Sequence, residues 1–201
     1  TAANAIFLQY TAPIYILILA PFVIGEKFHW RDLVTVMFCI AGMSLFFVGD
    51  LTVGDIQGNI AALGSGIFLG LYIMLLRHPK ALGMNGTITV IYGNFLLALL
   101  TLPSGIAAIP TAGVMDYVAV AFLGIFQIGI SYILFIKGVR GGTRPLDASI
   151  IGFIEPLLNP VWVFFFVGER PSNWAILGGA IIIATIIAHT FVQYRNRPVT
   201  A

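Results

Sequence analysis

Charged side chains are scarce in this chain, and their scarcity excludes most water-soluble folds. Only 9% of the 201 residues are Asp, Glu, Lys or Arg, whereas an ordinary soluble domain carries about a quarter. Cysteine is almost absent as well. The one thiol, Cys39, falls inside an apolar stretch, so there is no disulfide framework and the redox compartment stays open. The ten Lys and Arg residues form no basic stripe, so we expect no nucleic-acid partner.

Motifs for catalysis and cofactor binding are also missing. His29, His78 and His189 have no Cys or carboxylate at ligand spacing, so we expect no metal. No nucleotide-binding loop, dinucleotide fingerprint or GxSxG motif occurs, so we expect neither a cofactor nor enzymatic activity.

Apolar sequence is abundant instead. Hydrophobic residues make up 59% of the chain, and the mean hydropathy is +1.00. Apolar stretches of about 20 residues recur, the length a helix needs to cross ~30 Å of hydrocarbon. Alternating β patterns are absent, and a backbone in lipid must satisfy its own hydrogen bonds, so the expected class is an all-α membrane protein. Seven transmembrane helices are predicted, at 3–25, 32–49, 56–76, 86–108, 116–137, 146–168 and 173–192.

Basic residues gather in alternate loops between these predicted spans. Arg170 stands alone on one side, and the other nine lie on the opposite side: Lys27, Arg31, Arg77, Lys80, Lys137, Arg140, Arg144, Arg195 and Arg197. Positive charge is retained on the cytoplasmic side of a membrane. We therefore expect the chain to begin outside and its C-terminus to be cytoplasmic.

An internal repeat links two distant parts of the chain. Residues 10–27, YTAPIYILILAPFVIGEK, match residues 153–170, FIEPLLNPVWVFFFVGER, at an offset of 143 residues. Pro13 falls on Pro156, and both copies end in Gly-Glu and a basic residue. Five predicted spans separate the copies, so the two Gly-Glu turns should lie on opposite sides of the membrane. Inverted repeats of this kind recur in secondary transporters, with the substrate site near mid-membrane at the repeat interface.

At these residues the chain resembles the drug/metabolite transporter superfamily, and specifically its EamA-type members. The resemblance rests on AxxxxxLxYTAPIY…GEK, on FIEPLLNPVW…GER and on the span that follows each. It implies a multi-pass carrier of the bacterial inner membrane, with ten helices in two five-helix repeats. Residues 1–54 would hold the last two helices of the first repeat, and the first three helices of that repeat would be missing. Residues 55–196 would be the complete second repeat, and residues 197–201 a cytoplasmic tail.

The expected function is secondary transport by alternating access, including efflux. The expected partners are the lipid bilayer and a small metabolite such as an amino acid or a drug-like compound, and no oligomeric state is predicted. Two alternatives stay open. A seven-helix receptor or sensor fits the helix count, although the last span has no Lys for a retinal Schiff base. An intramembrane enzyme would need a nucleophile with a nearby base, and His189 has no Ser partner at suitable spacing.

Glu155 is the only acidic residue well inside a predicted span. It lies about 14 Å from the cytoplasmic end of its helix. A carboxylate at that depth is costly unless it faces a cavity, a partner or a proton. We therefore predict that Glu155 binds substrate, with proton carriage as an additional hypothesis. The alternative is a protonated Glu155 bonded to a backbone carbonyl that Pro156 or Pro160 has freed.

Asn159 and Trp162 follow Glu155 at i+4 and i+7, so the three side chains share one helix face. This face is the predicted substrate site. Helix kinks are predicted at Pro13, Pro156 and Pro160. Weaker candidates for substrate contact are Gln127, Ser131, Tyr72, Asn94 and Tyr10. Hydrogen bonds between helices explain these weaker candidates at least as well.

Small residues recur every four positions in the third predicted span. They are Gly54, Gly58, Ala62, Gly66 and Gly70. Such spacing places them on one face of a helix and predicts a ridge against which another helix packs closely.

Overall fold

The computed structural model describes residues 2–49, 51, 56–168 and 170–195. These residues form ten α-helices and no strand. Gly54, Glu169 and the predicted domain limits at 55, 196 and 197–201 lie outside the described residues. The chain divides into two compact units, Thr1–Leu75 with Arg144–Ala201 and Leu76–Thr143, which we call the first and the second unit.

Apolar helices dominate both units, as the composition requires. Six helical stretches are long and apolar enough to cross a membrane: Ala3–Val23, Ile56–Leu75, Gly86–Thr111, Val114–Arg140, Pro145–Phe166 and Asn173–Arg195. The all-helical, multi-pass class is thereby confirmed. The remaining predicted span, 32–49, is occupied by α3 (Trp30–Phe46). Its 17 residues extend about 25 Å at 1.5 Å per residue, so a count of seven spans stays a prediction.

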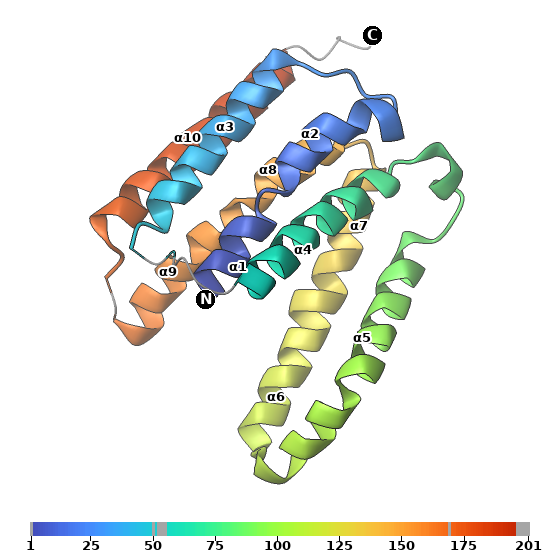
Figure 1. Cartoon of the computed structure of the whole chain (residues 1–201), viewed down its shortest axis with the longest axis vertical. Coiled ribbons are helices and arrows are strands. Elements are labelled where there is room, and N and C mark those ends of the chain that lie inside the picture. Colours follow the sequence, from blue (N-terminus) through green and yellow to red (C-terminus); the bar gives the residue numbers. More distant parts are fainter. Residues whose placement is uncertain (1, 50, 52–55, 169, 196–201) are drawn as a thin grey trace. The chain divides into compact units, whose positions relative to one another are not determined.

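The described residues of the first unit form seven α-helices, which are labelled in Figure 1. Besides α3, they are α1 (Ala2–Gln9), α2 (Ala12–Val23), α4 (Ile56–Leu75), α8 (Pro145–Gly152), α9 (Ile154–Val167) and α10 (Asn173–Arg195). The second unit is a pair of long helical segments. One is α5 (Gly86–Ala108). The other runs through α6 (Val114–Phe122), a π-helical stretch (Leu123–Ile130) and α7 (Ser131–Arg140).

Two of the predicted spans are each broken into two helices, and prolines explain where. A proline lacks the N–H that would bond the carbonyl four residues earlier, and its ring clashes with that carbonyl. The carbonyl four residues before Pro13 is that of Gln9, where α1 ends. The carbonyl four residues before Pro156 is that of Gly152, where α8 ends. The breaks lie before Pro13 and Pro156, two of the three prolines at which kinks are predicted. The third, Pro160, lies inside α9, and a kink there stays a prediction.

The helix limits recur at the spacing of the sequence repeat. Adding 143 to the bounds of α1 gives those of α8, and adding 143 to the first residue of α3 gives that of α10. The turns recur as well: Gly25 and Gly168 have φ angles of 72° and 81°. These left-handed values suit glycine, which has no Cβ to clash. Gly168 is the C-cap of α9, and Gly25 follows Ile24, the C-cap of α2.

Helices α3 and α10 pack side by side and antiparallel (Figure 1). Thr35 in the early part of α3 lies against His189 in the late part of α10. Phe46 at the end of α3 lies against Gly178 near the start of α10. These two contacts exchange under the repeat, because Thr35 falls on Gly178 and Phe46 falls on His189 at the offset of 143. This exchange is what local two-fold symmetry between the two helices requires.

The helix breaks lie close to the same axis. Tyr10, between α1 and α2, falls on Phe153, between α8 and α9, at the offset of 143. The two rings contact each other with centroids 5.3 Å apart. A residue that contacts its own repeat counterpart lies at the axis that relates the two copies.

Helix α4 packs on the first break through the predicted ridge. A Cβ on Gly66 would lie 2.9 Å from the Leu8 carbonyl oxygen, and one on Gly70 would lie 3.2 Å from that of Ala12. These distances leave no room for larger side chains, so α4 approaches the backbone of α1 and α2 directly. The Asn4 amide also donates to Asn59 at 3.1 Å.

Candidate functional site

The two helix breaks of the first unit bring Tyr10 and Glu155 together. Glu155 lies in the first turn of α9, where the partial positive charge of a helix N-terminus stabilises a carboxylate. The Tyr10 hydroxyl donates to its Oε2 at 3.0 Å. Phe153 is fully buried and supports the Tyr10 ring from the opposite break. One carboxylate is thus held at the axis between the two copies.

Asn159 and Trp162 continue this face along α9. Both side chains are exposed, as is Glu155. The Trp162 ring lies 6.1 Å from that of Phe166. The face therefore offers a carboxylate, an amide and an aromatic surface in order. Such a set can bind a small molecule that carries both a cationic group and an apolar part.

The other predicted contact residues divide between the units. Tyr72 lies in α4 of the first unit and is half-buried. Asn94, Gln127 and Ser131 belong to the second unit. The Asn94 amide donates to the Val90 carbonyl at 2.9 Å within α5.

The other two predicted contact residues, Gln127 and Ser131, lie in or next to the π-helical stretch. Gln127 lies inside it and is exposed. Ser131 follows it, and its hydroxyl donates to the carbonyl of Phe126 at 3.0 Å. That carbonyl lies five residues earlier, the spacing of a π-turn, and such turns are frequent at functional sites.

A second polar cluster surrounds Arg144, the N-cap residue of α8. Its guanidinium bonds Asp32 of α3 at 2.6 Å and lies 3.6 Å from Glu26 and 3.8 Å from Asp147. His29 lies 3.7 Å from the same Asp32 oxygen. Burial on its own lowers the pKa of Arg144. The hydrogen bond to Asp32 and the three surrounding carboxylates outweigh burial and raise the pKa above its usual value.

Asp147 extends the cluster to α10. Its Oδ1 lies 2.9 Å from His189 Nε2 and accepts from Gln193 at 2.6 Å. His189 Nδ1 lies 3.1 Å from the Thr35 hydroxyl. We call these side chains the Arg144 network: Glu26, Asp32, Thr35, Arg144, Asp147, His189 and Gln193. Among the described residues, no group of three or more His, Cys, Asp or Glu side chains is placed to hold a metal ion.

Sequence reasoning missed this network. Arg144 served only to orient the chain, and His189 was considered only as a possible ligand or base at a membrane edge. Its members lie at the ends of different helices and are far apart in the sequence: 112 residues separate Arg144 from Asp32, and 154 separate Thr35 from His189. A usable signal was present, because Glu26, Asp32 and Asp147 all lie at span ends that the charge pattern assigns to one side.

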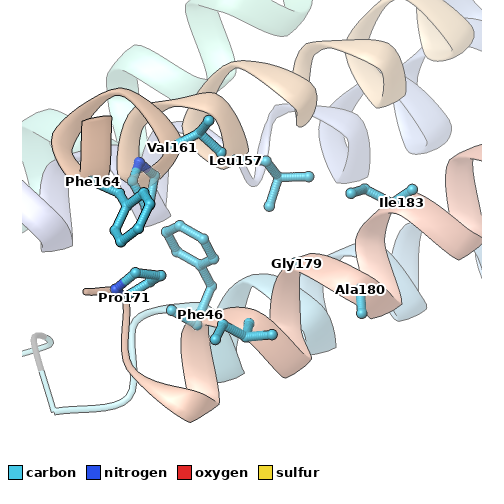
Figure 2. A pocket seen from close by; sticks show the side chains of 11 residues that line it. Phe46, Leu157, Val161, Phe164, Pro171, Gly179, Ala180 and Ile183 are labelled. Atoms are coloured by element: carbon cyan, nitrogen blue, oxygen red, sulfur yellow. The ribbon is translucent and has the colours of Figure 1, made fainter. Parts of the chain in front are cut away.

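A groove of about 460 Å³ lies between α9 and α10 and reaches the end of α3. Figure 2 shows Leu157, Val161 and Phe164 facing α10, with Phe46 beside them. The remaining lining residues are Pro160, Pro171, Ala175, Ile176, Gly179, Ala180 and Ile183. None of the lining side chains is ionisable, so the groove offers no partner for a charged metabolite.

Known proteins resemble the chain over most of its length. The EamA-like transporter family matches residues 1–48 and 56–191. An uncharacterized transporter of Archaeoglobus fulgidus is 25% identical over 187 residues, which are 92% of this chain and 66% of that protein. A probable terminal-alkyne amino-acid exporter of Streptantibioticus cattleyicolor is 23% identical over 189 residues, or 92% and 63% of the two chains. The chain thus spans slightly less than two thirds of these relatives, and neither name describes an enzyme or a receptor.

One solved crystal structure has the same fold. It superposes with a TM-score of 0.69 at 18% identity and covers 96% of this chain and 67% of the solved one.

Proposed function

Because the chain belongs to the EamA-like transporter family, we propose that it moves a small metabolite across the inner membrane by alternating access. The chain is a multi-pass membrane transporter by family and by its apolar helices. We propose that it forms part of a ten-helix, 5+5 inverted-repeat carrier. The recurrence of helix limits and the antiparallel α3–α10 pair support this arrangement.

The hydrogen bond between Tyr10 and Glu155 is the observation that carries the proposed substrate site. It joins one residue from each copy at the axis of the repeat, which is where a transporter of this architecture binds its substrate. The Tyr10 hydroxyl also keeps the acid hydrogen-bonded while no substrate is present, which reduces the cost of a polar group in lipid.

The exposed face of Glu155, Asn159 and Trp162 suits an amine-bearing metabolite. The carboxylate pairs with an ammonium group, the amide orients a neighbouring polar group, and the indole covers an apolar or cationic part. The name of the Streptantibioticus relative, an amino-acid exporter, supports the same class of substrate. An amino acid offers such an ammonium group.

The decisive experiment replaces Glu155 and measures uptake in proteoliposomes with and without an imposed pH gradient. Glu155→Gln keeps the shape but removes the charge, so we expect the apparent affinity for an amine-bearing substrate to fall by about tenfold or more. The matched control, Glu155→Asp, keeps a titratable acid and should retain part of the activity. Unchanged affinity in Glu155→Gln would remove Glu155 from the substrate site.

Proton coupling is a separate proposal for the same residue. If Glu155 carries the proton, Glu155→Gln should lose the acceleration of uptake by a pH gradient, whereas Glu155→Asp should keep it. Uptake by Glu155→Gln that still responds fully to the gradient would exclude the proton role.

A further inference from the structure

The α2–α3 pair and its repeat counterpart, the α9–α10 pair, are packed differently. The space between α2 and α3 at the Arg144 network is a cavity of about 10 Å³, room for no more than about one water molecule. The space between α9 and α10 is the groove of about 460 Å³. The linings correspond at the offset of 143: Leu17, Pro21, Phe28 and Asp32 in the closed space fall on Pro160, Phe164, Pro171 and Ala175 in the open one.

The two spaces also differ in their charged side chains. Asp32 falls on Ala175 and His189 falls on Phe46, and both counterparts line the open groove. Asp147 falls on Asn4. By sequence, Arg144 and Glu26 fall on Thr1 and Glu169, which lie outside the described residues. The ionic bridge is therefore built on one copy of the helix pair, and the described counterparts cannot reproduce it.

We infer that the Arg144 network is a latch that closes the α2–α3 end of the transporter in one half of its cycle. The inference rests on the proposed function. One guanidinium faces three carboxylates from the α2–α3 turn, α3 and α8, and Asp147 continues the bridge to α10. Without the cation the three carboxylates repel one another across this space.

Two features make the network a latch instead of a fixed support. The Arg144 side chain keeps 30% of its surface accessible, so water can replace its partners at modest cost when the helices separate. The repeat counterpart of this helix pair, α9–α10, has an open packing within the same molecule. Both packings are thus available to this sequence motif, which is what a two-state element requires.

A thiol-labelling experiment tests the latch in the full-length protein. Ala20 lines the closed space and is 6% exposed. In a Cys39→Ala background, Ala20→Cys provides one reporter thiol for a water-soluble methanethiosulfonate reagent. We expect slow labelling in the parent and labelling about tenfold faster when Arg144→Gln is added, because the closed space opens. Arg31→Gln, an exposed arginine at the same end, should change the rate by less than about twofold.

Native Cys39 separates opening from unfolding. It is fully buried in α3. In the Arg144→Gln variant that keeps Cys39 and lacks Ala20→Cys, the Cys39 thiol should therefore stay unlabelled as long as the protein is folded. Two results would overturn the latch. In the first, Arg144→Gln leaves the labelling rate of Ala20→Cys within about twofold of the parent rate. In the second, Cys39 is labelled as fast as the reporter thiol. Labelling needs no substrate, so a failure of the latch is distinguishable from a failure of the proposed transport activity.

Discussion

Gly178 allows α3 and α10 to touch backbone to backbone, and replacing it by alanine should separate them. A Cβ on Gly178 would lie 2.6 Å from the amide nitrogen and 3.0 Å from the Cα of Phe46, and closer still to the Gly42 carbonyl oxygen. Ordinary contact begins at 3.4 Å. All three atoms belong to the α3 backbone, so no side chain can rotate to make room. We expect the helices to move apart by about 1 Å at this point.

The energetic effect follows from two opposing terms. Overpacking of this kind costs about 1–3 kcal/mol. Alanine also favours a helix over glycine by about 1 kcal/mol. Gly179→Ala receives the same gain in helix propensity, but its Cβ meets only the Leu157 Cδ2 at 3.4 Å. The difference in unfolding free energy between Gly178→Ala and Gly179→Ala therefore isolates the steric term, at about 1–3 kcal/mol.

Equilibrium unfolding of the purified protein in mixed micelles, followed by tryptophan fluorescence, measures that difference. We expect Gly178→Ala to unfold at lower denaturant than the parent, and Gly179→Ala at the same or higher denaturant. Equal midpoints for the two variants would refute the close α3–α10 contact on which the two-fold packing depends.

Three further variants test other contacts. Tyr10→Phe removes the hydroxyl that donates to Glu155 and should weaken substrate affinity about threefold to tenfold in the uptake assay; unchanged affinity would show that this hydroxyl is dispensable. Asn59→Ala removes the acceptor for its amide partner in α1 and should lower the unfolding free energy by about 1 kcal/mol; an unshifted unfolding curve would argue against that link. Arg140 reaches two carbonyls in 81–84 through two separate guanidinium nitrogens, and Arg140→Lys leaves a single nitrogen without this fork, so limited proteolysis should cleave this segment several times faster, and an unchanged pattern would count against the anchor.

Helix positions could be predicted closely because the signals are local. The span 86–108 coincides with α5, since Asn85 accepts from the Thr87 amide and caps its start. The first residues of α4 and α10 also agree with the predicted spans. The breaks at Tyr10 and Phe153 were not predicted as breaks, because hydropathy is continuous through them. The carbonyl four residues before a proline marks both breaks, but Pro21, Pro103 and Pro160 lie inside continuous helices, so prolines alone do not select the two breaks.

The contacts of the site depend on which helices meet, and hydropathy carries no such information. Tyr10 and Glu155 were both candidates, but their pairing joins residues 145 apart in the sequence. The repeat contained the missing clue, since Tyr10 falls on Phe153, two residues from Glu155. The repeat gives no such clue for the pair of Arg144 and Asp32, because the counterpart of Asp32 is an alanine.

The counterpart of Glu155 at the offset of 143 is Ala12, a buried residue of α2, so the acid occurs in one copy only. Two identical chains assembled around the same axis would present their acids in pairs, close enough to repel. Joining two diverged copies in one chain lets the acid occur once, with Tyr10 from the other copy donating a hydrogen bond to it. A single acid at the axis of the repeat is therefore possible in a fused duplicate, whereas a homodimer would place two acids there.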